Sequence, residues 1–145
     1  MKQRKKGAAL VEFALAFVIL IPLVAGAFQY SIGFLQALRL EAAVRAAALY
    51  GSQLPYLSST ETPDSGFLIA VQNMALYGKP EDTGKPLIPT LRPEHVAVQV
   101  SLVAGVPRTV SVSIRGFTLV LPTGNRLLDG KPASSFPFRG RFEPR

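Results

Sequence analysis

Hydrophobic residues follow three patterns along this chain of 145 residues, and each pattern predicts a different kind of element. The first is a continuous apolar run from Ala8 to Phe28, in which Glu12 is the single charged residue. A helix needs about 20 apolar residues to cross a bilayer. Residues 8–28 therefore predict a membrane-spanning helix. Pro22 lies inside this run and is expected to kink the helix, because proline lacks the backbone N–H that a helix uses.

The second pattern is a helical period that continues beyond the apolar run. Apolar residues recur every three or four positions and form one stripe, made of Phe28, Ile32, Leu35, Leu38, Ala42, Ala46 and Leu49. The helix is expected to reach Tyr50, with Gly51 as its C-terminal cap, and to be about 63 Å long. About half of that length crosses a bilayer. Residues 29–50 are therefore expected to carry an outer domain or to pack with other subunits.

A second, shorter helix is predicted after a polar loop at residues 51–64. It covers residues 65–77, with Thr62 or Asp64 as the N-cap, and it ends at Gly78. Its expected buried face consists of Phe67, Val71 and Met74.

The third pattern begins after His95, where apolar and polar residues alternate as they do in half-buried strands. Three such runs, at residues 96–102, 109–115 and 117–121, predict a three-stranded antiparallel sheet. The stripe on the long helix and the short second helix are the candidates to cover its apolar face. The expected fold class is α+β: a long N-terminal helix packed on a small antiparallel sheet, with one short extra helix. The outer domain is expected to comprise residues 51–145.

The C-terminal tail, residues 129–145, has three phenylalanines between proline and glycine residues. This composition indicates an irregular edge segment docked on the sheet. The three arginines of the tail favour contact with solvent over contact with a neighbouring subunit.

The charge distribution adds an orientation to the predicted membrane helix. The formal net charge is +7, but four cations lie in the first six residues: Lys2, Arg4, Lys5 and Lys6. Cations next to a membrane helix mark its cytoplasmic side, so the rest of the chain is expected to lie across the membrane. A basic head directly before a membrane-length run indicates lipid as a partner and argues against nucleic acid.

Three interpretations of the N-terminal segment compete. One is a secretory signal peptide cut after Ala27, at the Ala25-Gly26-Ala27 site, although the apolar stretch is longer than the usual 7–15 residues. Another is a plain, uncut signal anchor. The last is a signal that is cut before the apolar run, so that the helix stays with the mature protein.

Glu12 favours the last of these interpretations. A carboxylate at the centre of a membrane helix costs about 2.5–3.5 kcal/mol, less near an end, and a plain anchor gains nothing from it. A new N-terminal amine at Ala8 of a neighbouring subunit would supply an ionic partner. The simpler alternative is a carboxylate that reaches the nearby interface.

The residues around this position resemble a known processing site. Lys5-Lys6-Gly7-Ala8-Ala9-Leu10-Val11-Glu12-Phe13 looks like a prepilin peptidase site, with cleavage after Gly7. More narrowly, this segment, followed by an apolar run with Pro22, is similar to TadE-like minor pseudopilins of tight-adherence (Flp-type, type IVb/IVc) pilus systems. Phe13 and the chain length set it apart from the short major Flp pilins, which usually carry Glu-Tyr.

The resemblance implies how the chain is processed, which proteins it contacts and where it is located. Residues 1–7 would be a leader, Ala8 the first mature residue and Glu12 the fifth. Prepilin peptidase, other pilins and an inner-membrane assembly platform would be its partners. The chain would cross the inner membrane once, with its N-terminus in the cytoplasm and its outer domain in the periplasm. The resemblance extends more loosely over residues 65–121, and many family members carry a cysteine pair that is missing here.

The composition excludes several kinds of chemistry. The chain has no cysteine and a single histidine, His95, which is expected at the surface or in a cap. Gly-Lys-Pro occurs three times without the spacing of a phosphate loop, and no EF-hand, catalytic-triad or metal-ligand spacing is present. The expected role is therefore structural, with no enzyme activity, metal or cofactor.

Alternatives from other classes remain. A signal-anchored extracytoplasmic binding module would stay uncut, and replacement of Glu12 would have no effect on it. A domain released after Ala27 would be soluble and would lack the first part of the long helix.

Overall fold

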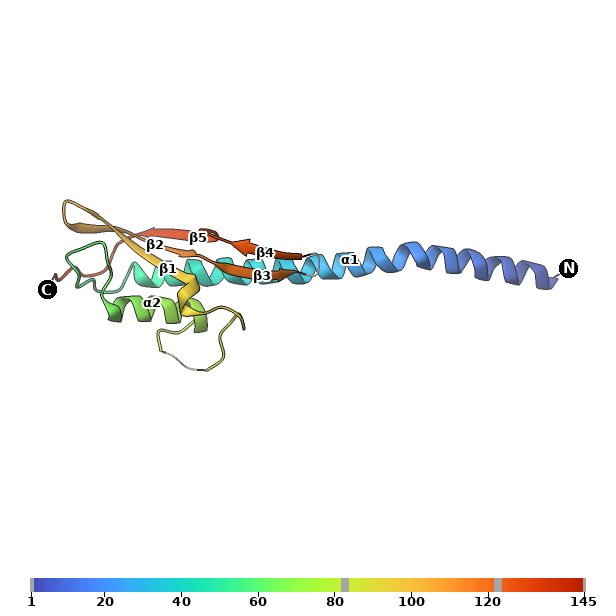
Figure 1. The fold of residues 1–145 in the computed structure, drawn as a ribbon, viewed down its shortest axis with the longest axis horizontal. Helices are drawn as coiled ribbons and strands as arrows, with labels where there is room; N and C mark the ends of the chain where they lie inside the picture. The colour runs from blue at the N-terminus through green and yellow to red at the C-terminus, as the bar shows by residue number, and fades with distance from the viewer. Residues whose placement is uncertain (1, 82–83, 122–123, 145) are drawn as a thin grey trace.

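One long helix organises the whole molecule (Figure 1). The computed structural model describes residues 2–81, 84–121 and 124–144, with side chains from Gly7 onward. Helix α1 comprises Lys2–Gly51 and is continuous, which confirms the predicted extension far beyond the apolar run. At 1.5 Å per residue its 50 residues are about 75 Å long. From Gly33 onward the helix has buried positions and lies in the domain. The part before Gly33 projects from the domain and is called the rod below.

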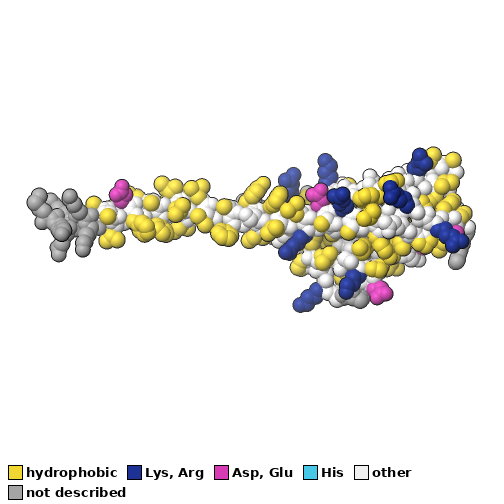
Figure 2. Space-filling view, turned by 180° about the vertical axis from the view of Figure 1, so that it is seen from behind, with side chains coloured by type: hydrophobic (Ala, Val, Ile, Leu, Met, Phe, Trp, Pro, Cys, Tyr) yellow, Lys and Arg dark blue, Asp and Glu magenta, His cyan; other side chains and the backbone are white. Residues whose placement is uncertain are grey.

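The rod is covered with exposed apolar side chains (Figure 2). Leu10 is 70% exposed, Val18 71% and Leu23 66%. Within the described part of the chain, α1 is the one helix long and apolar enough to span a membrane, with a mean hydropathy of 2.6 in its best window. An apolar surface of this extent is unfavourable in water. The helix therefore fits a single-pass membrane anchor.

The strands form two antiparallel sheets in the described residues. The larger sheet has the order β1-β2-β5, from strands β1 (Val96–Val103), β2 (Val106–Ile114) and β5 (Ala133–Pro137). Its register sets Val98 opposite Val112, and Val110 opposite Phe136. The smaller sheet is a hairpin of β3 (Phe117–Leu121) and β4 (Gly124–Leu128). The alternation of β1 and β2 and their pairing are confirmed.

The prediction that residues 117–121 form the third strand of the same sheet is wrong. Gly116 has a φ of 61°, so the backbone turns between β2 and β3, and β3 pairs with β4. The place beside β2 is taken by β5, from the C-terminal tail. Two hydrogen bonds join the end of β2 to the segment before β5 and so hold β5 beside β2: Ile114 N donates to Pro132 O, and Gly130 N donates to Ile114 O.

Both longer helices cover the same apolar face of the larger sheet. Helix α1 contacts β2 and β5, and α2 (Ser65–Tyr77) contacts β1 and packs beside α1. The core between them contains Leu40, Val44, Val71, Val110 and Val112, each less than 2% exposed. At about 0.8 kcal/mol per buried CH₂ group, this apolar layer is the main source of the stability of the domain.

The face of α1 that packs on the sheet is not the predicted stripe. The buried positions of α1 are Gly33, Leu40, Ala43, Val44, Ala47, Ala48 and Gly51. Small residues let α2 and β2 approach α1 closely: a Cβ at Gly51 would lie 3.0 Å from Val71 Cγ2 of α2 and 3.2 Å from Val110 Cγ1 of β2. The predicted stripe lies on the other side of the helix, where Leu35 is 53% and Leu49 45% exposed. Helix α1 therefore carries an apolar face that the domain does not cover.

Helix α2 has the predicted bounds and caps. Asp64 is the N-cap, and its Oδ2 accepts a hydrogen bond of 3.1 Å from Phe67 N. Gly78 is the C-cap, with a φ of 69° that glycine adopts without strain. The buried residues are Phe67, Val71, Ala75 and Leu76, while Met74 is half-buried.

The tail is tightly docked beyond β5. Tyr56 N donates to Arg141 O at 2.8 Å, Glu143 N donates to Tyr56 O at 3.0 Å, and Arg139 N donates to Ser52 O at 2.7 Å. Phe138 and Phe142 pack against the buried core. The expected edge docking is therefore confirmed. The expectation of an irregular, solvated segment is wrong for the backbone, because residues 133–137 form the regular strand β5 and the residues after it are hydrogen-bonded to Ser52 and Tyr56. The side chains of Arg139 and Arg141 are exposed, and Arg141 pairs with Glu143 at 2.7 Å.

Alkaline pH is expected to destabilise the domain through Tyr56. Burial raises the pKa of Tyr56 above its usual 10.0, and its hydroxyl donates to Thr60 O at 2.6 Å. A pKa raised in the folded state means that stability is intact below about pH 10 and falls as the pH rises above it. Urea unfolding near pH 8 and pH 11 measures this loss. Tyr56→Phe should cost about 1 kcal/mol and reduce the alkaline loss. Tyr30→Phe, at a residue 75% exposed, should leave both unchanged.

Candidate processing and assembly site

The predicted cleavage site lies on the exposed first part of the rod. Gly7 and Ala8 are both exposed and lie within α1. A Cβ added to Gly7 would meet no atom within 4 Å. Glycine in the middle of a helix costs roughly 0.5–1 kcal/mol relative to alanine. Packing among the described residues thus gives no reason for glycine at this position.

Glu12 lies one helical turn after Ala8, on the same side of the rod. The carboxylate is exposed and, among the described residues, has no hydrogen bond or ion pair. Figure 2 shows an acidic side chain near the start of the otherwise apolar rod. A charge surrounded by lipid or by apolar helices requires a partner. The chain itself does not supply one within the part that the structure describes.

Phe13 presents an aromatic surface beside this carboxylate. It is 62% exposed, and its ring lies 4.6 Å from that of Phe17, one turn further along. The two rings form an apolar ridge on the outside of the rod. Such a ridge is suited to packing into the groove of a second helix.

Pro22 lies within the continuous helix. Helical structure extends on both sides of it, and its missing N–H leaves the carbonyl of Val18 without its usual partner in the helix. The four predicted orienting cations, Lys2, Arg4, Lys5 and Lys6, lie on the first turns of α1, and their side chains are outside the described residues.

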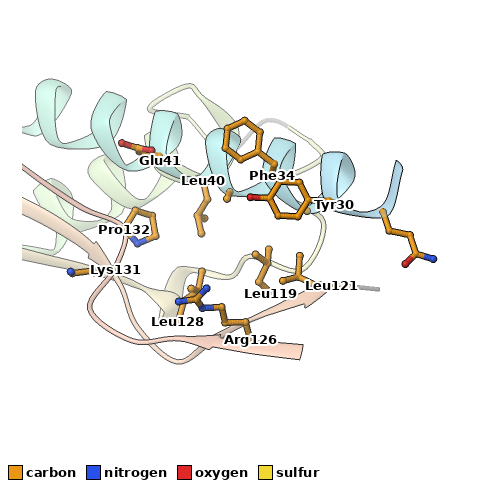
Figure 3. A pocket seen from close by; sticks show the side chains of 13 residues that line it. Tyr30, Phe34, Leu40, Glu41, Leu119, Leu121, Arg126, Leu128, Lys131 and Pro132 are labelled. Atoms are coloured by element: carbon orange, nitrogen blue, oxygen red, sulfur yellow. The ribbon is translucent and has the colours of Figure 1, made fainter. Parts of the chain in front are cut away.

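A groove lies where the rod enters the domain (Figure 3). It has a volume of about 420 Å³ and is bounded by α1 on one side and by the β3–β4 hairpin on the other. Tyr30 and Phe34 line it on the side of α1, and Leu119, Leu121 and Arg126 line it on the side of the hairpin. The alternation pattern did not predict this groove, because it gave no strand at the position of β4. The turn-forming sequence of residues 122–125, directly after a predicted strand, was the available signal.

Comparison with protein families identifies the segment that holds this site. Residues 7–49 match the family model described as TadE-like protein. The long helix is therefore similar to that of TadE-like proteins over most of its length. The match confirms the resemblance, and it contains Gly7, Ala8, Glu12, Phe13 and Pro22. No curated protein and no solved structure was found to match the chain.

The TadE-like segment coincides closely with α1. It begins at Gly7 and ends two residues before the helix does, so it contains both the apolar rod and the part of α1 that forms the core of the domain. The TadE-like family is a structural, pilus-associated family and not an enzyme family. The match therefore supports an association of this chain with a Tad-type pilus.

Among the described residues, no cluster of three or more His, Asp or Glu side chains could hold a metal ion. His95 caps a short 3-10 turn, η1 (Pro93–His95): its Nδ1 accepts from Arg92 N at 3.1 Å, and its ring packs on Phe117. The prediction of a capping histidine is confirmed.

Proposed function

We propose that this TadE-like protein is a pseudopilin, a structural or assembly subunit of a Tad-type pilus or secretion machinery. Prepilin peptidase would cut it after Gly7, and the mature helix from Ala8 would pack with the helices of other pilins. Residues 8–28 would cross the inner membrane, residues 29–50 would continue the helix into the periplasm, and residues 51–145 would form the outer domain with them. The inner-membrane assembly platform would be a further partner.

The observation that carries this proposal is the unpartnered Glu12 on an apolar, exposed rod. The carboxylate is costly in a helix that only anchors a domain, since the chain provides no compensating charge among the described residues. The free amine of Ala8 on a neighbouring subunit would compensate it and set the register between the two helices. Cleavage after Gly7 is what would create that amine.

A second observation supports assembly rather than simple anchoring. The uncovered apolar face of α1 continues beyond residue 28 into the domain, where Ile32 is 52% and Leu35 53% exposed. A pure membrane anchor has no need of an apolar face outside the bilayer. A helix that packs against other subunits along its whole length does.

Processing is tested by expressing the chain with and without the prepilin peptidase of its own system. The mature protein is expected to begin at Ala8, as read from its N-terminal sequence and intact mass, only when the peptidase is present. Gly7→Val should abolish the cut. Gly26→Val is the matched control, because both glycines lie in α1 and neither has an atom within 4 Å of an added Cβ.

Other N-termini would support other functions. An intact Met1 in both samples would indicate the uncut, signal-anchored binding module. A start after Ala27 would indicate a soluble, secreted domain. The domain would tolerate that cut, because the residues of α1 that it buries begin only at Gly33.

A further inference from the structure

The β3–β4 hairpin lies at the end of the domain nearest to the rod. Its two strands run along α1 and end beside the bare part of the helix (Figure 1). Leu121 at the end of β3 packs directly on Gly33, where a Cβ would collide with its side chain. The end of the hairpin is thus fixed five residues beyond Phe28, the last residue of the apolar run.

This position corresponds to the headgroup layer of a membrane crossed by residues 8–28. Five residues of α-helix rise about 7.5 Å. The headgroup layer on each side of a bilayer is about 5–7 Å thick, from the difference between the full bilayer and its hydrocarbon core. With the apolar run in the hydrocarbon core, the end of the hairpin therefore reaches the outer edge of the headgroups.

The side chains at this level have the composition of a membrane-interface contact. Val120 is 62% exposed and Tyr30 75% exposed, and tyrosine is enriched at this depth in membrane proteins. Arg126 pairs with Leu119, so its backbone lies two residues, or about 7 Å, further from the membrane than the end of β3. Its side chain is exposed and has no hydrogen bond or ion pair among the described residues. A long arginine side chain can lie along apolar surface and extend its guanidinium group to a phosphate.

The charges near the hairpin favour an anionic ligand. Arg126 lines one side of the hairpin, and Arg39 lies near Val120 on the other side. Lys131 lies at the far end of the groove, where Glu41 also lies, so neither is near the membrane level. The acid of the groove, Glu41, lies eight residues beyond Gly33, about 12 Å further from the membrane. Figure 2 shows Lys and Arg side chains where the rod meets the domain.

We infer that the β3–β4 hairpin is a second membrane contact, in which Arg126 binds the phosphates of anionic phospholipids on the hairpin face toward Tyr30, and Val120 contacts the headgroups from the opposite face. The inference rests on the proposed membrane location of α1, and it adds a lipid-binding surface on the outer domain. The contact would hold the domain at a fixed height and tilt above the bilayer. Subunits would then present their uncovered helix faces at the same level.

The absence of cysteine makes a direct test simple, because any introduced cysteine is unique. Full-length protein is reconstituted into vesicles of phosphatidylcholine alone or mixed with phosphatidylglycerol. A fluorophore on Val120→Cys reports contact with a headgroup quencher. Val103→Cys, which is 58% exposed at the end of β1, is the matched control. A fluorophore on Ile19→Cys with an acyl-chain quencher reports insertion of α1.

The expected result is strong headgroup quenching at position 120, weak quenching at 103, and an increase at 120 when phosphatidylglycerol is present. Arg126→Gln should lower the ratio of docked to undocked hairpin about fivefold in the anionic vesicles. Arg108→Gln, an exposed arginine of β2, should leave it unchanged. Circular dichroism of both variants should match that of the wild type.

Three results would overturn the inference in distinguishable ways. Equal quenching at 120 and 103 with Ile19 quenched would remove the hairpin contact and leave the membrane helix intact. An unquenched Ile19 would overturn the membrane location as well. Protection of position 120 that depends on protein concentration and not on the lipid would assign the hairpin to a contact between subunits.

Discussion

Replacing Gly140 with alanine is expected to destabilise the outer domain by about 3 kcal/mol. A Cβ at this position would collide with the backbone carbonyl of Leu54 and lie 3.0 Å from the ring of Phe138. Backbone atoms cannot move aside as a flexible side chain can. The tail would therefore have to lift from the loop after α1, which would break the hydrogen bonds on either side of Gly140, from Arg139 N to Ser52 O and from Tyr56 N to Arg141 O.

Urea unfolding of the full chain in micelles, followed by near-ultraviolet circular dichroism, measures this loss. Arg139→Ala is the matched control: it changes the neighbouring residue, whose side chain is exposed, and it keeps the backbone hydrogen bond. It should change stability by less than about 0.5 kcal/mol. Equal stability of Gly140→Ala and the wild type would mean that the tail contributes little to the domain.

The elements that could be predicted from the sequence are those specified by local signals. Helix α2 needs only a capping aspartate, an apolar face and a glycine in the left-handed region, and all three lie within fifteen residues. The strands β1 and β2 alternate over most of their length and are joined by a short turn. The candidate site from Gly7 to Phe13 is a local motif of consecutive residues, so it can be recognised without knowledge of the fold.

The face on which α1 packs could not be predicted from periodicity. Hydrophobic residues occur on more than one side of this helix, because one side contacts the domain and another remains uncovered. The prediction chose the side with large residues, Ile32, Leu35 and Leu38, whereas the sheet and α2 pack on the side with glycine, alanine and valine. Close approach of backbones favours small residues, and a hydrophobicity pattern does not register that preference.

The pairing of β5 with β2 and the groove beside α1 depend on contacts between distant parts of the chain. β5 reads Ala133-Ser134-Ser135-Phe136-Pro137, which has too little alternation to predict a strand. The strand forms because the edge of β2 opposite β1 is free to pair with it. The backbone hydrogen bonds of Tyr56 with Arg141 and Glu143 hold the residues after β5 in place. Arg126 acquires its position only when β4 folds back on β3.

Replacing Glu12 with glutamine is expected to reduce incorporation of the subunit into pilus assemblies by at least about a hundredfold. Removing one partner of a buried ion pair costs roughly 3–5 kcal/mol, because the other charge is left uncompensated. Here that charge would be the amine of Ala8 on the neighbouring subunit. Insertion of the single helix should not suffer, since glutamine removes the cost of a carboxylate in the membrane. Glutamine should thus lower incorporation into assemblies without lowering insertion into the membrane. This difference separates a role of Glu12 in assembly from a role in anchoring.

The measurement compares the amount of protein in the membrane with the amount in pilus and assembly-platform fractions of host cells. Glu12→Asp should restore part of the incorporation, because it keeps the charge on a shorter side chain. Glu41→Gln is the control, as an exposed acid on the same helix but beyond the apolar run. If Glu12→Gln were incorporated like the wild type, the carboxylate would have no ionic partner. If glutamine instead lowered the amount in the membrane, Glu12 would act before assembly, in insertion or processing. A deficit confined to the assembled fractions is the result that only a contact between subunits explains.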